Sequence, residues 1–152
     1  MKYTSTREDK ELLNFKQVTL KGLASDGGLY VPENWKKFNL KLTNRDITFE
    51  KTAYEIIKYF VGKSLENQLL KKLISRSYKN FRNKEITTLK QLDKNNYILE
   101  LYHGPTLAFK DIALQFLGNA FEVFLKKEKK KLTIIGATSG DTGSAAIEII
   151  RS

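Results

Sequence analysis

The sequence predicts an α/β protein, with a small mixed α/β N-terminal domain followed by the start of a doubly wound parallel-sheet domain. Three observations lead to this fold class. Apolar residues recur every three or four positions between residues 48 and 74, Leu132 to Ile135 is a short continuous apolar run, and strands alternate with helices after residue 84. A chain of 152 residues is long enough for one small domain and part of another.

The first 32 residues contain signals for short strands around one helix. Lys2 to Thr6 alternates in a way that suits a strand, and Asn14 is placed to cap a helix that ends at Gly22. The turn residues Asp26-Gly27-Gly28 precede a short strand at Leu29 to Val31. We expect all of these residues to be structural.

Two amphipathic helices are predicted next. The first begins after Thr48 and ends at Gly62, with apolar side chains at Phe49, Ala53, Ile56, Ile57, Phe60 and Val61. Ser64 is placed to cap the second, whose apolar stripe consists of Leu65, Leu69, Leu70, Leu73 and Ile74. Stripes with this spacing are usually core faces, so we expect both helices to pack inward.

The second half alternates between strands and helices. The predicted elements are strands at 86–92 and 97–101, a helix at 109–125 that is apolar nearly all round, a parallel-type strand at 132–135 and a helix at 142–150. Loops that leave consecutive strands of a parallel sheet lie on its carboxyl edge, where ligands bind. We therefore expect the segments 103–110 and 136–142 to face one crevice.

Residue usage excludes several kinds of site. The chain has no cysteine and one histidine, His103, so disulfides, thiolate metal sites and cysteine nucleophiles are excluded and no metal site is expected. No apolar run approaches the roughly 20 residues of a membrane helix, and polar residues follow Met1 where a signal peptide would be apolar. A cytoplasmic protein without a membrane partner is expected.

The formal net charge of +10 raises the question of an anionic partner. Basic and acidic residues are interspersed, and only Lys126 to Lys131 forms a dense run, at the end of a predicted helix where cations complement the helix dipole. We interpret this charge as a solvated surface, with an anionic partner as the alternative. No nucleic acid is expected, and the oligomeric state is not predicted.

The loop after the predicted 132–135 strand is rich in small residues. Gly140 and Gly143 allow backbone amides to approach a ligand, and the following helix start favours negative charge. Hydroxyls at Thr138, Ser139 and Thr142 add donors. The loop lacks the endings and spacings of Walker, dinucleotide-binding and hydrolase motifs. It therefore suits a carboxylate or phosphate, although an ordinary capped turn has the same spacing.

Lys110 lies in the first turn of the predicted 109–125 helix. The positive end of the helix dipole and the apolar neighbours Phe109 and Ile112 disfavour an ammonium there, and a neutral lysine can form a Schiff base. A surface position is the alternative, because most lysines of this chain are surface charges. His103, at a predicted strand end, either orients a ligand or hydrogen-bonds its own loop.

Three segments of the chain resemble those of a known enzyme family. They are Glu100 to Asp111 (ELYHGPTLAFKD), Gly136 to Ala146 (GATSGDTGSAA), and an opening segment with Ser5-Thr6-Arg7 and Gly22 to Pro32 (GLASDGGLYVP). They resemble segments of threonine synthase, a pyridoxal-phosphate (PLP) enzyme of fold type II. The resemblance spans the chain and implies a threonine-synthase-like N-terminal domain at 1–84, with an incomplete PLP-binding catalytic domain beginning at 85–152.

The resemblance also implies a reaction and a role for each matched residue. Threonine synthases convert O-phospho-L-homoserine and water to L-threonine and phosphate, with PLP as the electron sink. Lys110 would hold the cofactor as a Schiff base and move protons on the substrate, Phe109 would pack beside it, and Asp141 would lie near the cofactor ring hydroxyl. The residues implied for the substrate carboxylate are Thr138, Ser139, Gly140 and Thr142.

Family members are considerably longer, so the resemblance implies a truncated N-terminal fragment. The loop for the cofactor phosphate and the partner of the pyridine nitrogen would lie beyond Ser152, and this chain alone is expected to be inactive. Two alternatives stay open. One is another fold type II PLP enzyme, such as a dehydratase or a β-replacing synthase, and the other is a non-catalytic basic binding module.

Overall fold

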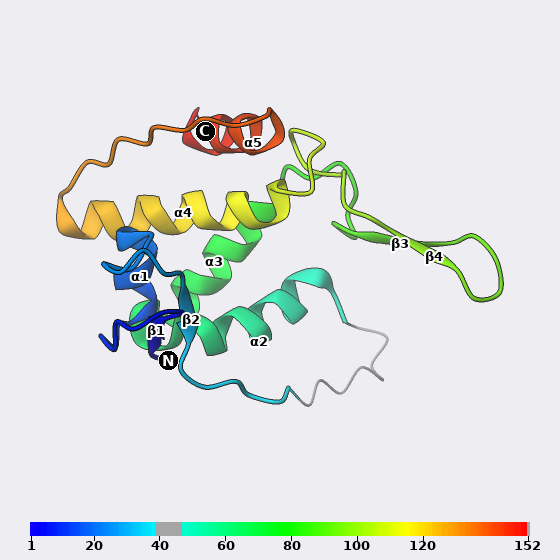
Figure 1. Cartoon of the computed structure of the whole chain (residues 1–152). Helices are drawn as coiled ribbons and strands as arrows, with labels where there is room; N and C mark the ends of the chain where they lie inside the picture. Colours follow the sequence, from blue (N-terminus) through cyan, green and yellow to red (C-terminus); the bar gives the residue numbers. More distant parts are fainter. Residues whose placement is uncertain (39–46, 152) are drawn as a thin grey trace. The chain divides into compact units, whose positions relative to one another are not determined.

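The computed structural model describes residues 1–38 and 47–151 (Figure 1). The elements in chain order are β1 (Tyr3–Ser5), α1 (Phe15–Lys21), β2 (Tyr30–Pro32), α2 (Phe49–Val61), the 3-10 turn η1 (Gly62–Ser64), α3 (Asn67–Tyr78), β3 (Thr88–Gln91), β4 (Tyr97–Glu100), α4 (Asp111–Glu128) and α5 (Asp141–Arg151). They form two compact units, Met1–Lys72 and Leu73–Ser152. Across the described residues, no helix has both the length and the apolar character needed to span a membrane.

The first unit begins with two short strands and a capped helix. β1 and β2 pair antiparallel. Asn14 caps α1 as predicted, because its side chain accepts the Gln17 N–H at 3.0 Å while the Gln17 side chain accepts the Asn14 N–H at 2.9 Å. Gly22 ends the helix, also as predicted. The core cluster here contains Tyr3, Leu13 and Val18, with Met1, Phe15 and Tyr30 packed against it.

Helix α2 begins and ends where the sequence predicts. Thr48 accepts a backbone N–H at its start, and Gly62 ends it with a φ of 53°. The predicted cap of the next helix is wrong. Ser64 ends η1, and its hydroxyl accepts the Lys16 N–H at 3.3 Å, so this side chain supports α1, while α3 begins only at Asn67.

In the second unit, α4 buries the apolar side chains of Ala120 and Phe124 completely, as its composition predicts, and it also buries a polar stripe that the sequence did not indicate. Asp111, Gln115 and Asn119 are at most 6% exposed and recur every four residues, so they share one face. The Asn119 side-chain amide donates to the Ser77 hydroxyl at 3.0 Å, and that hydroxyl donates to the Leu73 carbonyl at 2.7 Å. Hydrogen bonds therefore join this face of α4 to the end of α3.

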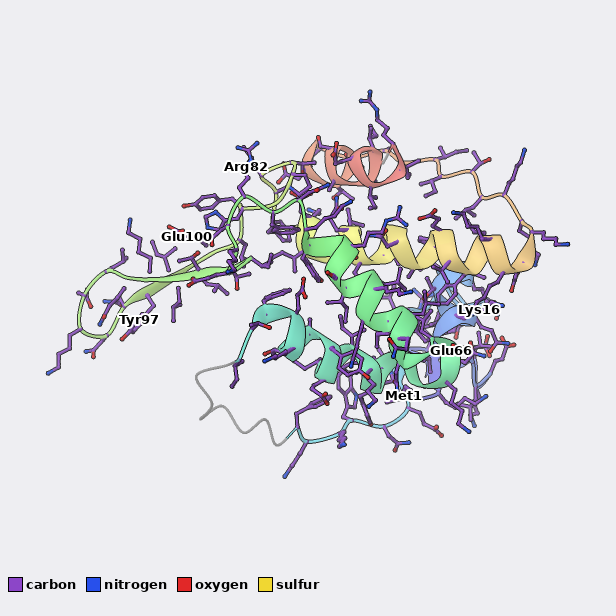
Figure 2. All side chains as sticks on the ribbon, turned by 180° about the vertical axis from the view of Figure 1, so that it is seen from behind. Met1, Lys16, Glu66, Arg82, Tyr97 and Glu100 are labelled. Atoms are coloured by element: carbon purple, nitrogen blue, oxygen red, sulfur yellow. The ribbon has the colours of Figure 1, made fainter. Side chains whose placement is uncertain are left out.

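The strands predicted at 86–92 and 97–101 form the β3–β4 hairpin. Thr88 pairs with Glu100 and Gln91 with Tyr97 in antiparallel register. The Asp93 carboxylate closes the turn by accepting two backbone N–H groups at 3.0 Å. Figure 2 shows Tyr97 toward the turn and Glu100 at the base of the hairpin. The base of β4 leads directly into the first predicted loop.

Helices α4 and α5 pack together and run in the same direction. In Figure 1 the chain after α4 returns along it, so both helices begin at the same end of the pair. A Cβ at Gly118 would lie 2.3 Å from the Ile149 Cγ1, so the absence of a side chain permits this approach. Gly118 and Ile149 lie about equally far from the starts of their helices, as a parallel arrangement requires.

The strand predicted at Leu132 to Ile135 does not form. Both sheets of the described residues are two-stranded and antiparallel, and neither includes this segment. The Ile135 side chain is 93% exposed. A strand of a parallel sheet needs a hydrogen-bonding neighbour and cover on both faces, and β4 pairs instead with β3. The predicted parallel pairing is therefore wrong within this chain, while the two flanking helices are present.

Candidate functional site

Asp111 holds the first loop against the start of α4. Its carboxylate accepts the Thr106 N–H at 2.8 Å and the Thr106 hydroxyl at 2.7 Å. The Leu107 N–H donates to the Gly104 carbonyl at 3.2 Å, in a turn where Leu107 has a φ of 62°. A Cβ at Gly104 would lie 2.3 Å from the Asp111 Oδ2, so this turn requires glycine.

Lys110 is the residue immediately before α4. Its carbonyl accepts the Leu114 N–H at 2.9 Å, so this hydrogen bond to the helix fixes the position of the Lys110 backbone. The Nζ lies 4.5 Å from the centre of the Phe109 ring, within the range of a cation–π contact. The side chain is half-buried, and no carboxylate of the described residues pairs with it. Because Phe109 is 56% exposed, the apolar surroundings predicted for Lys110 are only partly present.

His103 contacts residues at the base of the hairpin. Its Nε2 lies 3.1 Å from the Glu100 Oε2, and its carbonyl accepts the Arg82 N–H at 2.8 Å. Hydrogen bonding to the Glu100 carboxylate raises the pKa of Tyr102, whose ring lies 4.7 Å from the His103 ring between centroids. Arg82 and Glu100 lie near this base in Figure 2. These contacts correspond to the predicted alternative in which His103 supports its own loop.

Thr138 caps the second loop at the start of α5. Its Oγ1 accepts the N–H groups of Gly140 at 3.2 Å and Gly143 at 3.1 Å. Gly140 has a φ of 140°, in the region that favours glycine, and a Cβ at Gly143 would lie 2.7 Å from the Thr138 Oγ1. The capped turn considered in the sequence is therefore present, and both glycines are needed for it.

The same loop retains backbone donors that an anion could use. Asp141 and Thr142 occupy the first positions of α5, where an N–H has no acceptor within the helix. Neither N–H donates to any residue within 1–38 or 47–151. Ser139 and Asp141 are exposed, and Thr142 is half-buried. The capped turn is therefore compatible with an anion-binding loop, because the cap uses the amides of Gly140 and Gly143 and leaves those of Asp141 and Thr142 available.

The structure places the two predicted loops at the same end of the α4–α5 pair. It brings Lys110 together with Phe109, and Thr138 together with its two glycines. No hydrogen bond joins one loop to the other in the part of the chain that is described. The role of Asp111 in holding the first loop was missed, although an acid in the first turn of a helix is a recognisable sequence signal.

The N-terminal half of the chain matches a known family. Residues 2–78 match the family described as threonine synthase N terminus. This chain belongs to the threonine synthase family. Threonine synthase of Pseudomonas aeruginosa is 47% identical over 150 residues, and that of Schizosaccharomyces pombe is 44% identical over 169 residues. The matches cover 97% and 98% of this chain, and 32% and 31% of the two relatives.

A solved threonine synthase shares the fold. The crystal structure of PLP-bound threonine synthase from Brucella melitensis superimposes on 98% of this chain with a TM-score of 0.92 and 40% sequence identity. The superposition covers 32% of that structure. The predicted family and the mixed α/β character of the fold are therefore confirmed, and the chain spans about a third of the length of these relatives.

Proposed function

We propose that this chain contributes the amine side of a PLP-dependent threonine synthase site, which converts O-phospho-L-homoserine and water to L-threonine and phosphate. The proposal depends chiefly on Lys110, which presents a half-buried amine with no carboxylate partner among the described residues. The loop before α5 lies at the same end of the helix pair and offers donors for an anion. An amino-acid substrate on an aldehyde cofactor requires both features.

The residues present fit PLP. A lysine without an ion pair can condense with an aldehyde, and the exposed Phe109 ring offers an apolar surface beside the amine. When bound, PLP supplies an electron sink for charge that develops on the substrate. The free N–H groups of Asp141 and Thr142 suit the substrate carboxylate, because helix starts favour anions.

Each site residue has a proposed role. Lys110 holds the cofactor through its Nζ and moves protons at the substrate, while Phe109 restricts water on one side of that amine. The Asp141 carboxylate is proposed to accept a hydrogen bond from the cofactor ring hydroxyl. The substrate carboxylate is proposed to be bound by Thr138, Ser139, Gly140 and Thr142. The Thr138 Oγ1 already accepts two N–H groups, and its own proton stays available for donation.

The assignment of residues to two domains is also a proposal. We propose that residues 1–84 form the N-terminal domain and that residues 85–152 begin the catalytic domain. The compact units of the structure divide earlier, between Lys72 and Leu73, because the end of α3 packs on α4. Since the chain spans about a third of its relatives, we propose that turnover requires residues outside it.

Substrate choice separates this proposal from its alternatives. The relatives described above are threonine synthases, which favours this proposal over another fold type II enzyme and over a basic binding module. The protein that carries this chain should form threonine and phosphate from O-phosphohomoserine and should not turn over serine. Lys110→Ala should abolish threonine formation, while Lys127→Ala, at an exposed lysine of the same helix, should not. Serine turnover without threonine formation would contradict the proposal.

A further inference from the structure

The carboxylate of Asp111 is completely buried, with 0% of the residue exposed. No cation of the described residues forms a salt bridge with it. A buried carboxylate without a partner is strongly unfavourable, so its hydrogen bonds and the positive end of α4 must offset its desolvation. Both hydrogen bonds that this carboxylate accepts within the described residues come from Thr106. The contact between Asp111 and Thr106 is therefore the main interaction of this buried group within the described structure.

This contact closes the loop that precedes α4. Thr106 is held through its main chain and through its side chain, so both its position and its orientation are fixed. The Asp111 N–H donates to the Ala108 carbonyl at 3.0 Å, which ties the other side of the loop to the same residue. Between them, Leu107 adopts a φ of 62°, a conformation that a β-carbon disfavours and that surrounding contacts must maintain. We call residues 104–111, closed in this way, the Asp111 clasp.

The clasp contains the proposed cofactor lysine, Lys110. Lys110 follows Ala108, whose carbonyl accepts the Asp111 N–H, by two residues, and its own carbonyl accepts the Leu114 N–H from the first turn of α4. The backbone of Lys110, from which its side chain extends, therefore has little freedom to move. Its Nζ rests on the ring of Phe109, which belongs to the same closed loop. From this geometry we infer that Asp111 and Thr106 are positioning residues that hold the Lys110 amine in place, an inference that rests on the function proposed for Lys110.

Reactivity of Lys110 relative to an exposed lysine tests the inference on the 152-residue chain. Lys127 is the internal reference, because it is exposed in the last turn of the same helix. The chain is incubated with PLP and reduced with borohydride, and the ratio of adduct at Lys110 to adduct at Lys127 is measured by peptide mass spectrometry. Thr106→Val and Asp111→Asn should each lower this ratio roughly tenfold, because small misplacement of a reacting group has large rate effects. Thr106→Ser keeps the hydroxyl and should preserve the ratio.

Two controls separate positioning from general loss of stability. Ser77→Ala removes buried hydrogen bonds of the same unit without touching the clasp, so it should lower the urea midpoint and leave the ratio unchanged. Acetic anhydride labels amines without needing a cofactor site. With this reagent, Thr106→Val and Asp111→Asn should raise the Lys110 to Lys127 ratio, because the released amine leaves the Phe109 ring for solvent.

The outcomes distinguish the inference from the proposed function. If the acetylation ratio is the same in the unmodified chain, Thr106→Val and Asp111→Asn, or if Ser77→Ala changes it equally, the positioning role is wrong. If PLP shows no preference for Lys110 in the unmodified chain while the acetylation ratios shift as expected, the clasp stands and the proposed cofactor role of Lys110 fails.

Discussion

The contact between Gly118 and Ile149 predicts the sign of a stability change. Replacing glycine by alanine inside a helix normally stabilises a protein by about 0.5–1 kcal/mol. Here the new Cβ would lie 2.3, 2.8 and 3.1 Å from the Cγ1, Cγ2 and Cβ of Ile149. One rotamer change cannot clear all three atoms, and overpacking of this kind costs about 1–3 kcal/mol. We therefore expect Gly118→Ala to lower the free energy of unfolding by about 1 kcal/mol.

Ile149→Ala provides the matched background for this prediction. It removes the two nearest atoms and leaves only the Cβ, at 3.1 Å. In that background Gly118→Ala should become stabilising, by about 0.5 kcal/mol or more. Urea denaturation of the four proteins, followed by far-UV circular dichroism, gives the coupling energy of the double-mutant cycle. Equal stabilisation by Gly118→Ala in both backgrounds would refute the close packing of α4 on α5.

Three further predictions concern local interactions. Asn14→Ala removes the capping box of α1 and should lower the free energy of unfolding, measured by urea denaturation, by about 0.5–2 kcal/mol. Asn14→Asp keeps a capping oxygen and should retain most of the stability of the unmodified chain. Equal losses in the two variants would contradict the cap. The hydrogen bond from the Asp9 N–H, with others from Gly28 and Ser5, lowers the pKa of Asp26 from 3.8 to about 2, so its stabilising effect should be present above pH 4 and be lost as the pH falls toward 2. Asp26→Asn should flatten that part of the stability profile, and an unchanged acid transition would count against it. Burial raises the pKa of both Tyr78 and Tyr3 to about 12, so absorbance titration of Tyr78→Phe should show a smaller late phenolate signal than the unmodified chain, with the Tyr3 contribution retained.

Local signals in the sequence predicted the helices well. Asn14, Thr48, Gly22 and Gly62 lie at the helix ends that their types indicate, because capping depends on neighbouring backbone groups alone. Ser64 has the same chemistry but a different partner, the Lys16 N–H, which is distant in sequence. Its hydroxyl could bond either nearby or remotely, and the sequence does not contain the tertiary contact that decides between them.

The missing strand at Leu132 to Ile135 has a comparable cause. Its composition is typical of a buried parallel strand, but strand formation requires a neighbour that composition does not supply. In this chain β4 pairs with β3 across a short turn, and the apolar segment stays exposed. Periodicity indicates which face of a segment is apolar, while pairing depends on the whole sheet.

The polar stripe of α4 was not predicted, for a related reason. Most residues of this helix are apolar, and Ala120 and Phe124 are fully buried as that composition predicts. The buried residues also include Asp111, Gln115 and Asn119, which are spaced four apart in the sequence. Polar residues at this spacing can be buried only if they find hydrogen-bond partners. Here Asn119 donates to Ser77 of α3, a tertiary contact that the spacing does not predict.

For the candidate site, the sequence proposes which residues belong to it, and the structure adds the contacts that hold its two loops. The motifs identified Lys110 and the 138–142 loop, and the structure places both at the same end of a parallel helix pair. The cap formed by Thr138 and the loop closure by Asp111 depend on distances that spacing does not provide. The cofactor and substrate roles of these residues stay predictions.

The site of PLP attachment tests the central claim most directly. After borohydride reduction and digestion, mass spectrometry should find the adduct mainly on the peptide that contains Lys110. Lys110→Arg should remove that adduct without transferring it to Lys127, an exposed lysine of the same helix. Adducts spread over Lys126 to Lys131, with Lys110 unmodified, would contradict the assignment of Lys110 as the cofactor amine.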